Sequence, residues 1–132
     1  NEERTPEQKD RGDQLTATGQ RPGTPLYMSP EQIVGSYYVD QRTDVYSAGV
    51  VLYEILCLDV PFTGKNIHGT FDMVIHDKPM LPSQKNPRRK IPSQLEAICM
   101  KALEKEPAKR QPSISELIMQ VRDFQQHQKM IS

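Results

Sequence analysis

The feature that most constrains this chain is an apolar stretch at residues 44–58, DVYSAGVVLYEILCL. Wound into a helix, the stretch places apolar side chains on nearly every side rather than on one stripe, which is typical of a helix in the middle of a domain. Its β-branched and aromatic residues would also suit a strand, but the stretch is too long for a typical one. We therefore predict a central helix with the rest of the chain packed around it.

Helix-starting signals occur on both sides of this stretch. Ser29-Pro30-Glu31-Gln32 places a capping Ser before a Pro and an acid, which predicts a short helix ending near Gly35. Residues 66–76 show an amphipathic helical pattern, and the capping boxes Ser93-x-x-Glu96 and Ser113-x-x-Glu116 predict two further helices. The apolar residues expected to face inward are Ile67, Phe71, Val74, Ile75, Leu95, Ile98, Cys99, Leu103, Leu117, Ile118, Val121 and Phe124. From residue 29 onward the chain is thus predicted to be mainly α.

Residues 1–22 differ from the remainder in composition. They carry many charges and almost no large apolar side chains, so they cannot bury enough surface to offset the entropy of ordering, and we expect a flexible arm. A chain of 132 residues has room for one domain, which we place at 23–127, with a short tail at 128–132. Because the 17 basic and 17 acidic side chains balance, we expect no net field that attracts nucleic acid or an anionic membrane.

Neither the cysteines nor a basic run at 88–90 predicts a binding site by itself. Cys57 and Cys99 lie in apolar runs and share no ligand-like spacing with the histidines, so we predict buried thiols rather than a disulfide or a metal site. Arg88-Arg89-Lys90, in the proline-containing loop 77–92, is predicted mainly to be solvated, with a docking role left open. No signal peptide or membrane span is recognisable, so we expect a cytoplasmic location, while an anchor outside this chain stays open.

Three motifs follow one another along the chain. They are GTPLYMSPE at residues 23–31, DVYSAGV at residues 44–50 and LEKEPAKR at residues 103–110. Ser-Pro-Glu alone would be an ordinary helix start. Together the three strings resemble the end of the activation segment, the start of the central helix and the L-x-x-[DE]-P-x-x-R element of serine/threonine protein kinases. The resemblance implies the C-terminal-lobe portion of the protein-kinase fold, mainly α, with a flexible N-terminal activation-segment arm.

The resemblance also implies two structural roles. Glu31 would form a buried ion pair with Arg110, whose planar guanidinium can hold a carboxylate through two hydrogen bonds. Asp44 would hold the catalytic loop by accepting hydrogen bonds from its backbone. An ordinary helix cap beside Thr43 is the simpler reading of that Asp.

Substrate positioning would fall to the residues before the first predicted helix. By resemblance, Thr24 would help to position the acceptor alcohol, and Leu26 and Tyr27 would contact the substrate residue that follows it. A simple turn at residues 23–25 is the alternative. Thr16-Ala17-Thr18 resembles the T-x-T pair in the activation loops of bacterial eukaryotic-like (Hanks-type) kinases, where phosphate would order the loop by pairing with an Arg. Because exposed threonines are also common in flexible arms, phosphorylation of Thr16 and Thr18 stays one of two readings.

The residues that carry out phosphoryl transfer in this family do not occur in the sequence. The family requires a Gly-rich loop, a strand Lys, an H-R-D-x-x-x-x-N catalytic loop and a D-F-G metal ligand. Asp10-Arg11-Gly12 has the D-x-G form, but it follows a charged stretch rather than an apolar strand, so we reject it. ATP and Mg²⁺ are therefore implied by the family, while this chain is predicted to hold no catalytic or metal-binding residue.

We accordingly expect part of an enzyme that, in the complete domain, transfers the γ-phosphate of ATP to Ser or Thr of protein substrates. A catalytically inactive module that binds substrates or partners is the second reading, and an unrelated helical interaction domain is the third. A helix that is apolar on all sides also needs neighbours from the rest of such a domain, so we predict that the isolated chain exposes a sticky patch. The residues of that predicted patch are Val45, Val50, Val51, Leu52 and Ile55.

Overall fold

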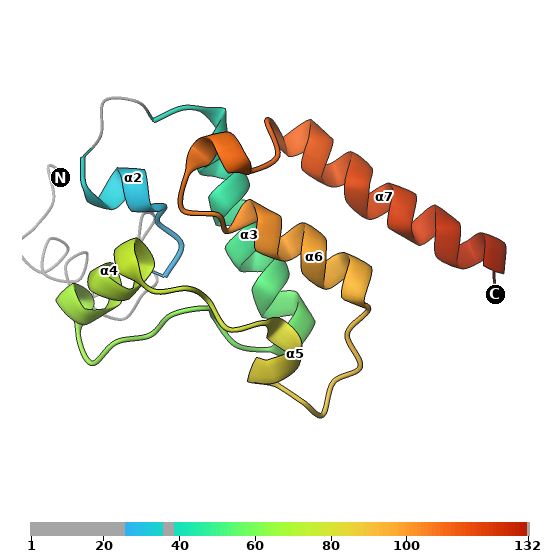
Figure 1. The fold of residues 1–132 in the computed structure, drawn as a ribbon, viewed down its shortest axis with the longest axis horizontal. Helices are drawn as coiled ribbons and strands as arrows, with labels where there is room; N and C mark the ends of the chain where they lie inside the picture. The colour runs from blue at the N-terminus through green and yellow to red at the C-terminus, as the bar shows by residue number, and fades with distance from the viewer. Residues whose placement is uncertain (1–25, 36–38, 132) are drawn as a thin grey trace, which may run out of the picture.

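A computed structural model of the chain describes residues 26–35 and 39–131. Within these ranges all regular structure is helical, so the prediction of a mainly α fold is confirmed. The elements are α2 (Pro30–Ile33), α3 (Gln41–Cys57), α4 (Ile67–His76), α5 (Pro82–Lys85), α6 (Ser93–Ala102), the 3₁₀ helix η1 (Pro107–Lys109) and α7 (Ile114–Ile131). Helix α3 runs through the middle of the molecule beside α6, while α7 extends outward to the C-terminus (Figure 1). Helices α2 and α4 lie together at the opposite end.

Helix α3 begins earlier than the sequence pattern indicated. Its N-cap is Asp40, whose carboxylate accepts a hydrogen bond from the backbone N–H of Arg42 at 2.9 Å. The predicted start near Asp44 was wrong by one turn, because residues 41–43 are polar and carry no apolar periodicity. Asp44 therefore lies in the first turn of the helix rather than before it.

The C-terminal end of α3 is closed by the loop that contains the basic run. Leu58 takes a left-handed conformation with φ of 64°, which ends the helix. Arg89 donates from Nε to the carbonyl of Leu56 at 2.7 Å, and Asn86 donates from Nδ2 to the carbonyl of Cys57 at 2.9 Å. Arg89 is solvent-exposed, as predicted for this run, and its side chain also satisfies a helix carbonyl that has no partner within the helix.

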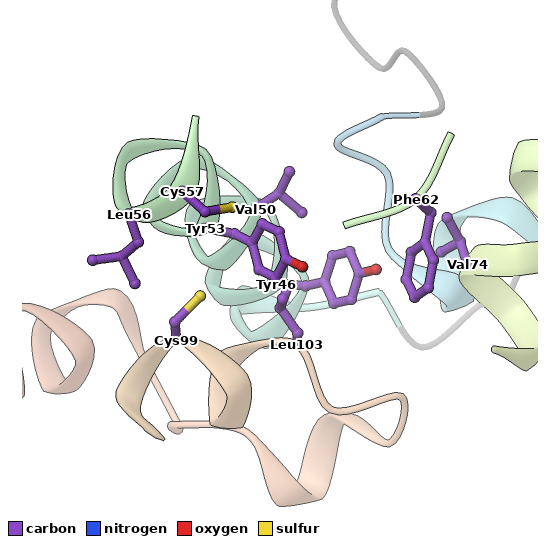
Figure 2. Packing of buried hydrophobic residues seen from close by; sticks show 9 residues of the cluster. All are labelled: Tyr46, Val50, Tyr53, Leu56, Cys57, Phe62, Val74, Cys99 and Leu103. Carbon is purple, nitrogen blue, oxygen red and sulfur yellow. The ribbon is translucent and has the colours of Figure 1, made fainter. Parts of the chain in front are cut away.

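The main core is built on one side of α3. Figure 2 shows side chains from α3 pointing toward α6 and toward the segment around Phe62. The buried members of this core are Tyr46, Val50, Tyr53, Leu56, Cys57, Phe62, Val74, Cys99 and Leu103. A smaller cluster of Val45, Ala102 and Leu117 joins α3 and α6 to α7. The central position predicted for this helix is therefore confirmed on the side that faces α6 and α7.

Close packing between α3 and α6 depends on a small residue at the crossing. A Cβ atom added to Gly49 would lie 2.7 Å from Cβ of Ala102, a separation that real Cβ atoms do not tolerate. The Sγ of Cys99 also reaches the carbonyl of Gly49 at 3.5 Å. The glycine is thus required for the close approach of the two helices, and it is not required for a turn.

The two capping-box predictions had different outcomes. Ser113 accepts a hydrogen bond at Oγ from the backbone N–H of Glu116 at 3.2 Å, as predicted for the start of α7. Ser93, in contrast, is the first helical residue of α6, and Pro92 before it makes no side-chain cap. Glu96 instead accepts a hydrogen bond from the backbone N–H of Ser83 at 2.7 Å and so ties α6 to α5. A competing tertiary partner for the Glu therefore displaced the capping box.

Several smaller expectations are settled by burial. The predicted helix at 66–76 is present as α4 with Asn66 as its N-cap, and Val74 is buried. Ile118, which was expected to face inward, is 44% exposed on α7.

Cys57 and Cys99 are buried free thiols, and burial raises the pKa of both, that of Cys99 to about 12. None of the helices in the described ranges has both the length and the apolar character needed to cross a bilayer.

Candidate substrate-facing site and its anchors

A short loop before α2 is the first part of the candidate site that the structure describes. Ser29 caps α2 by accepting a hydrogen bond at Oγ from the N–H of Gln32 at 3.2 Å. The Gln32 side chain returns the contact by accepting from the N–H of Ser29 at 2.9 Å, which completes a capping box. Because Pro30 occupies the first helical position, both the direction and the start of this helix are determined locally.

Tyr27 is held in place by two side chains of α3. Its hydroxyl donates to Oε1 of Glu54 at 2.7 Å, and its carbonyl accepts a hydrogen bond from the Ser47 hydroxyl at 2.8 Å. The hydrogen bond to Glu54, aided by burial, raises the pKa of Tyr27. Since Ser47 and Glu54 are two helical turns apart, the loop lies along α3 rather than touching it at a single point.

Glu31, in the first turn of α2, is buried against the start of α3 and the chain after α6. Its side chain accepts hydrogen bonds from Thr43 Oγ1 at 2.7 Å and from Nη1 and Nη2 of Arg110 at 2.7 and 2.8 Å. Burial alone would raise the pKa of this carboxyl group, but the hydrogen bonds from Arg110 and Thr43 prevail and lower it to about 2. Glu31 is therefore ionised at neutral pH.

Arg110 uses all of its hydrogen-bond donors within the chain. Besides the two bonds to Glu31, its guanidinium donates to three backbone carbonyls, those of Arg42, Glu104 and Lys105, at 2.9, 2.7 and 3.1 Å. A guanidinium has five N–H groups, so none is left unpaired. The guanidinium carbon also lies 5.1 Å from the ring centroid of Tyr46, within the range of a cation–π contact. One buried side chain thus joins α2, the start of α3 and the segment before η1.

A sequence profile for the protein kinase domain matches residues 7–122 of the chain. This match covers the loop at Tyr27, the Glu31–Arg110 pair and all helices from α2 to the first part of α7. The chain belongs to the protein kinase family. The described helices correspond to the C-terminal-lobe portion of the kinase fold, and the profile begins earlier than the residue-by-residue resemblance, which started at Thr16.

Curated kinases from bacteria give the same assignment. The chain is 38% identical over 104 residues to serine/threonine-protein kinase pkn3 of Myxococcus xanthus, which covers 79% of this chain and 19% of that protein. It is 38% identical over 108 residues to PknB of Mycobacterium tuberculosis, covering 82% of this chain and 17% of PknB. A probable serine/threonine-protein kinase of Clostridium perfringens is 42% identical over 96 residues, or 73% of this chain and 14% of that protein. The chain therefore spans less than a fifth of these kinases.

The kinase-like site includes residues that the sequence reading did not single out. Thr43 was named only as the neighbour of Asp44, but its hydroxyl donates to the Glu31 carboxylate. Ser47 and Glu54 lie inside the apolar helix pattern, where a polar residue signals only partial exposure, and both hold Tyr27. Asp44 is exposed, and its carboxylate has no hydrogen-bond donor among the residues that the structure describes. Thr24, Thr16 and Thr18 lie outside the described residues.

The residues present do not fit an ATP or Mg²⁺ site. The kinase motifs for phosphate and metal do not occur in the sequence. In the described ranges, no group of three or more His, Cys, Asp or Glu side chains gathers in a way that could hold a metal ion. No catalytic step is therefore assigned to a residue of this chain.

One side of α3 in this kinase portion has no neighbour among the described residues. Val51 and Ile55 are 47 and 60% exposed and lie one turn apart on one face of α3, and Leu58, the C-cap that follows, is 69% exposed; we call these three residues the α3 stripe. The predicted sticky patch is thus only partly correct. Val45 is buried against α6 and α7, Val50 is buried in the main core, and Leu52 is partly buried, whereas Val51 and Ile55 are exposed as predicted.

Proposed function

We propose that this chain is the substrate-facing part of a serine/threonine protein kinase, which transfers the γ-phosphate of ATP to Ser or Thr of protein substrates when the domain is complete. The observation that carries the proposal is the fixed position of Tyr27, whose hydroxyl and carbonyl are both held by α3. In the family, the loop at this position contacts the substrate residue after the acceptor. A loop with two such anchors can bind a substrate without first being ordered, which lowers the entropic cost of binding.

The Glu31–Arg110 pair also helps to fix the position of the Tyr27 loop. It fixes α2 against the start of α3, and α2 begins three residues after Tyr27. An ion pair of this kind acts as a structural anchor, since Glu31 is buried and makes no contact that would bring it to a substrate. Leu26 lies beside Tyr27 in the loop and is proposed to share its contact with the substrate.

The remaining roles are proposals from the family resemblance. Asp44 would accept hydrogen bonds from the backbone of the catalytic loop, and its exposed position in the first turn of α3 leaves its carboxylate accessible for that contact. Thr24 would position the acceptor hydroxyl. Phosphorylation of Thr16 and Thr18 would order the activation segment by pairing with an Arg.

The decisive experiment uses the coding sequence upstream of Asn1. If that frame encodes H-R-D and D-F-G motifs, the complete domain is expressed and assayed for transfer of labelled γ-phosphate to a protein substrate. We expect transfer by the complete domain and none by the 132-residue chain. Transfer by the short chain, or an inactive complete domain, would contradict the proposal; a frame without these motifs would favour the partner-binding module.

The role of Tyr27 has its own test within the complete domain. Tyr27→Phe removes the hydroxyl that donates to Glu54, so we expect kcat/KM for the protein substrate to fall about tenfold while KM for ATP is unchanged. Lys129→Ala, at an exposed position near the end of α7, is the matched control and should leave both constants unchanged. Equal loss for both variants would remove Tyr27 from the substrate site.

A further inference from the structure

A pocket separate from the Tyr27 loop lies between the end of α4 and the end of α6. It has a volume of about 410 Å³, within the usual range for a site that binds a small ligand or a few side chains. One wall is formed by residues that follow α4, including Lys78 and Leu81, and the other by Met100, Leu103 and Lys105. None of these side chains takes part in holding Tyr27, Glu31 or Arg110.

Lys105 is the unusual member of this pocket. Its ammonium nitrogen is buried and has no hydrogen-bond acceptor among the described residues. The nitrogen lies over the ring of Phe62, 4.6 Å from its centroid. A buried ammonium without an acceptor loses its hydration without full compensation, so the site would gain from an acceptor supplied by a ligand.

The charges around Lys105 do not supply that acceptor. Burial lowers the pKa of Lys105, and the negative charge of Asp77 opposes this shift without making a hydrogen bond. Asp77 and Glu104 are both exposed, so their charges are screened by solvent. Lys78 and His76 add basic groups at the rim of the pocket.

We propose that this pocket binds a carboxylate flanked by apolar side chains, as presented by an acidic and apolar segment of a protein partner. The carboxylate would pair with Lys105 after a rotamer change moves the ammonium from Phe62 into the pocket, with Lys78 as a second donor. The apolar flanks would pack on Leu81 and Met100. Met80, which is half exposed next to this wall, extends the apolar surface beyond the pocket and favours a peptide over a small anion.

The test is a titration of the ¹⁵N-labelled 132-residue chain with the peptide N-acetyl-Leu-Glu-Leu-amide. We expect saturable shifts of the backbone amides of Lys78 and residues 100–105. The matched peptide N-acetyl-Leu-Gln-Leu-amide should bind about tenfold more weakly, because it lacks the charge that pairs with Lys105. Equal binding of the two peptides, no saturable shift, or shifts confined to Val51 and Ile55 on the α3 stripe would each overturn the proposal.

Variants separate the role of Lys105 from a general charge effect. Lys105→Met should weaken binding of the Glu peptide about tenfold, whereas Lys101→Met, an exposed change on α6, should leave binding unchanged. Lys78→Ala, at an exposed rim position, provides a second test that does not require the fold to tolerate a change at Lys105. It should weaken binding about threefold, and unchanged binding by Lys78→Ala and Lys105→Met alike would contradict the assignment.

Discussion

The N-terminal end of α3 and its exposed apolar face differ in how many of their contacts are made within the described residues. At its N-terminal end, Arg110 has an acceptor for each of its N–H groups, and the Glu31 carboxylate is held by Arg110 and Thr43. Farther along, the α3 stripe of Val51, Ile55 and Leu58 has no covering element in the described ranges. The hydrogen bonds of the Glu31–Arg110 anchor are thus all made between described residues, while the α3 stripe has no described residue packed over it.

This difference follows from the physical cost of leaving each surface unfinished. An unpaired buried charge costs several kcal/mol, so a buried ion pair is tolerated only where both partners and their remaining hydrogen bonds are present together. An exposed Val or Ile loses only the free energy that burial would have given. We therefore expect the anchor to respond sharply to single changes and the stripe to respond weakly.

The largest expected effect is the loss of Arg110. Arg110→Met leaves the Glu31 charge buried without its main partner, and we expect the free energy of unfolding to fall by about 3–5 kcal/mol. Urea denaturation followed by circular dichroism measures the change. The matched control is Glu106→Gln, which removes the exposed Lys109–Glu106 pair at 3.7 Å and should cost about 0–1 kcal/mol.

The double variant Glu31→Met with Arg110→Met tests why the single change is costly. It removes both charges, so it should be more stable than Arg110→Met alone. Recovery should be incomplete, because the carbonyls of Arg42, Glu104 and Lys105 also lose the donors that Arg110 supplied. A double variant no more stable than the single one would place the cost in those carbonyls rather than in the unpaired carboxylate.

Acid should break the same anchor without a mutation. The pKa of Glu31 is lowered in the folded chain to about 2 from an ordinary 4.5, so ionised Glu31 contributes stability above pH 4.5. That contribution should be lost progressively as the pH falls from about 4.5 to about 2. Unfolding curves for the native chain and Glu31→Gln across this window give the measurement. The stability difference between them should shrink toward low pH, and a constant difference would contradict the role of ionisation.

How far the sequence predicts this site depends on the kind of signal each residue leaves. Glu31 and Arg110 are 79 positions apart, and no helical pattern relates them; only the motif resemblance suggested that they pair. Three further residues act through single hydrogen bonds that form only in the folded chain: Thr43, Ser47 and Glu54. A hydroxyl or carboxyl group within a helical pattern is indistinguishable in the sequence from an ordinary surface residue, so these roles were not predicted. Local signals behaved differently, since the caps at Ser29 and Ser113 were predicted from adjacent residues alone.

The errors in the fold have the same origin. Apolar periodicity located α3 but placed its start one turn late, because the cap at Asp40 precedes the first apolar residue. Glu96 was read as a capping residue, yet it bonds to Ser83 in a short helix that the pattern did not indicate. Arg89 is exposed as predicted, but its hydrogen bond to a carbonyl of α3 was not foreseen. In each case the missed contact is made by a polar side chain, and its partner is either distant in sequence or lies in a segment without a recognisable hydrophobic pattern.

The covered side of α3 should respond to a single added methyl group. Gly49→Ala would gain about 1 kcal/mol in helix propensity, but its Cβ would clash with Cβ of Ala102. We expect a net loss of about 2 kcal/mol in the free energy of unfolding, since the two helices must move apart. The pair Gly49→Ala with Ala102→Gly removes the clash and should recover most of that loss. A stabilising Gly49→Ala would show that the crossing is looser than the structure indicates.

The smallest effect compares two adjacent valines of α3, one buried and one exposed. Val50 is 1% exposed and Val51 is 47% exposed, so Val50→Ala should cost about 1–2 kcal/mol of unfolding free energy and Val51→Ala less than about 0.5 kcal/mol. The same urea denaturation measures both. In the complete kinase domain, the cost of Val51→Ala should rise toward that of Val50→Ala if the missing portion covers the α3 stripe. A cost that stays small there would mean that the α3 stripe remains exposed in the complete domain. The exposed stripe, like the fully paired Arg110, would then be a feature of the complete domain as well as of this chain.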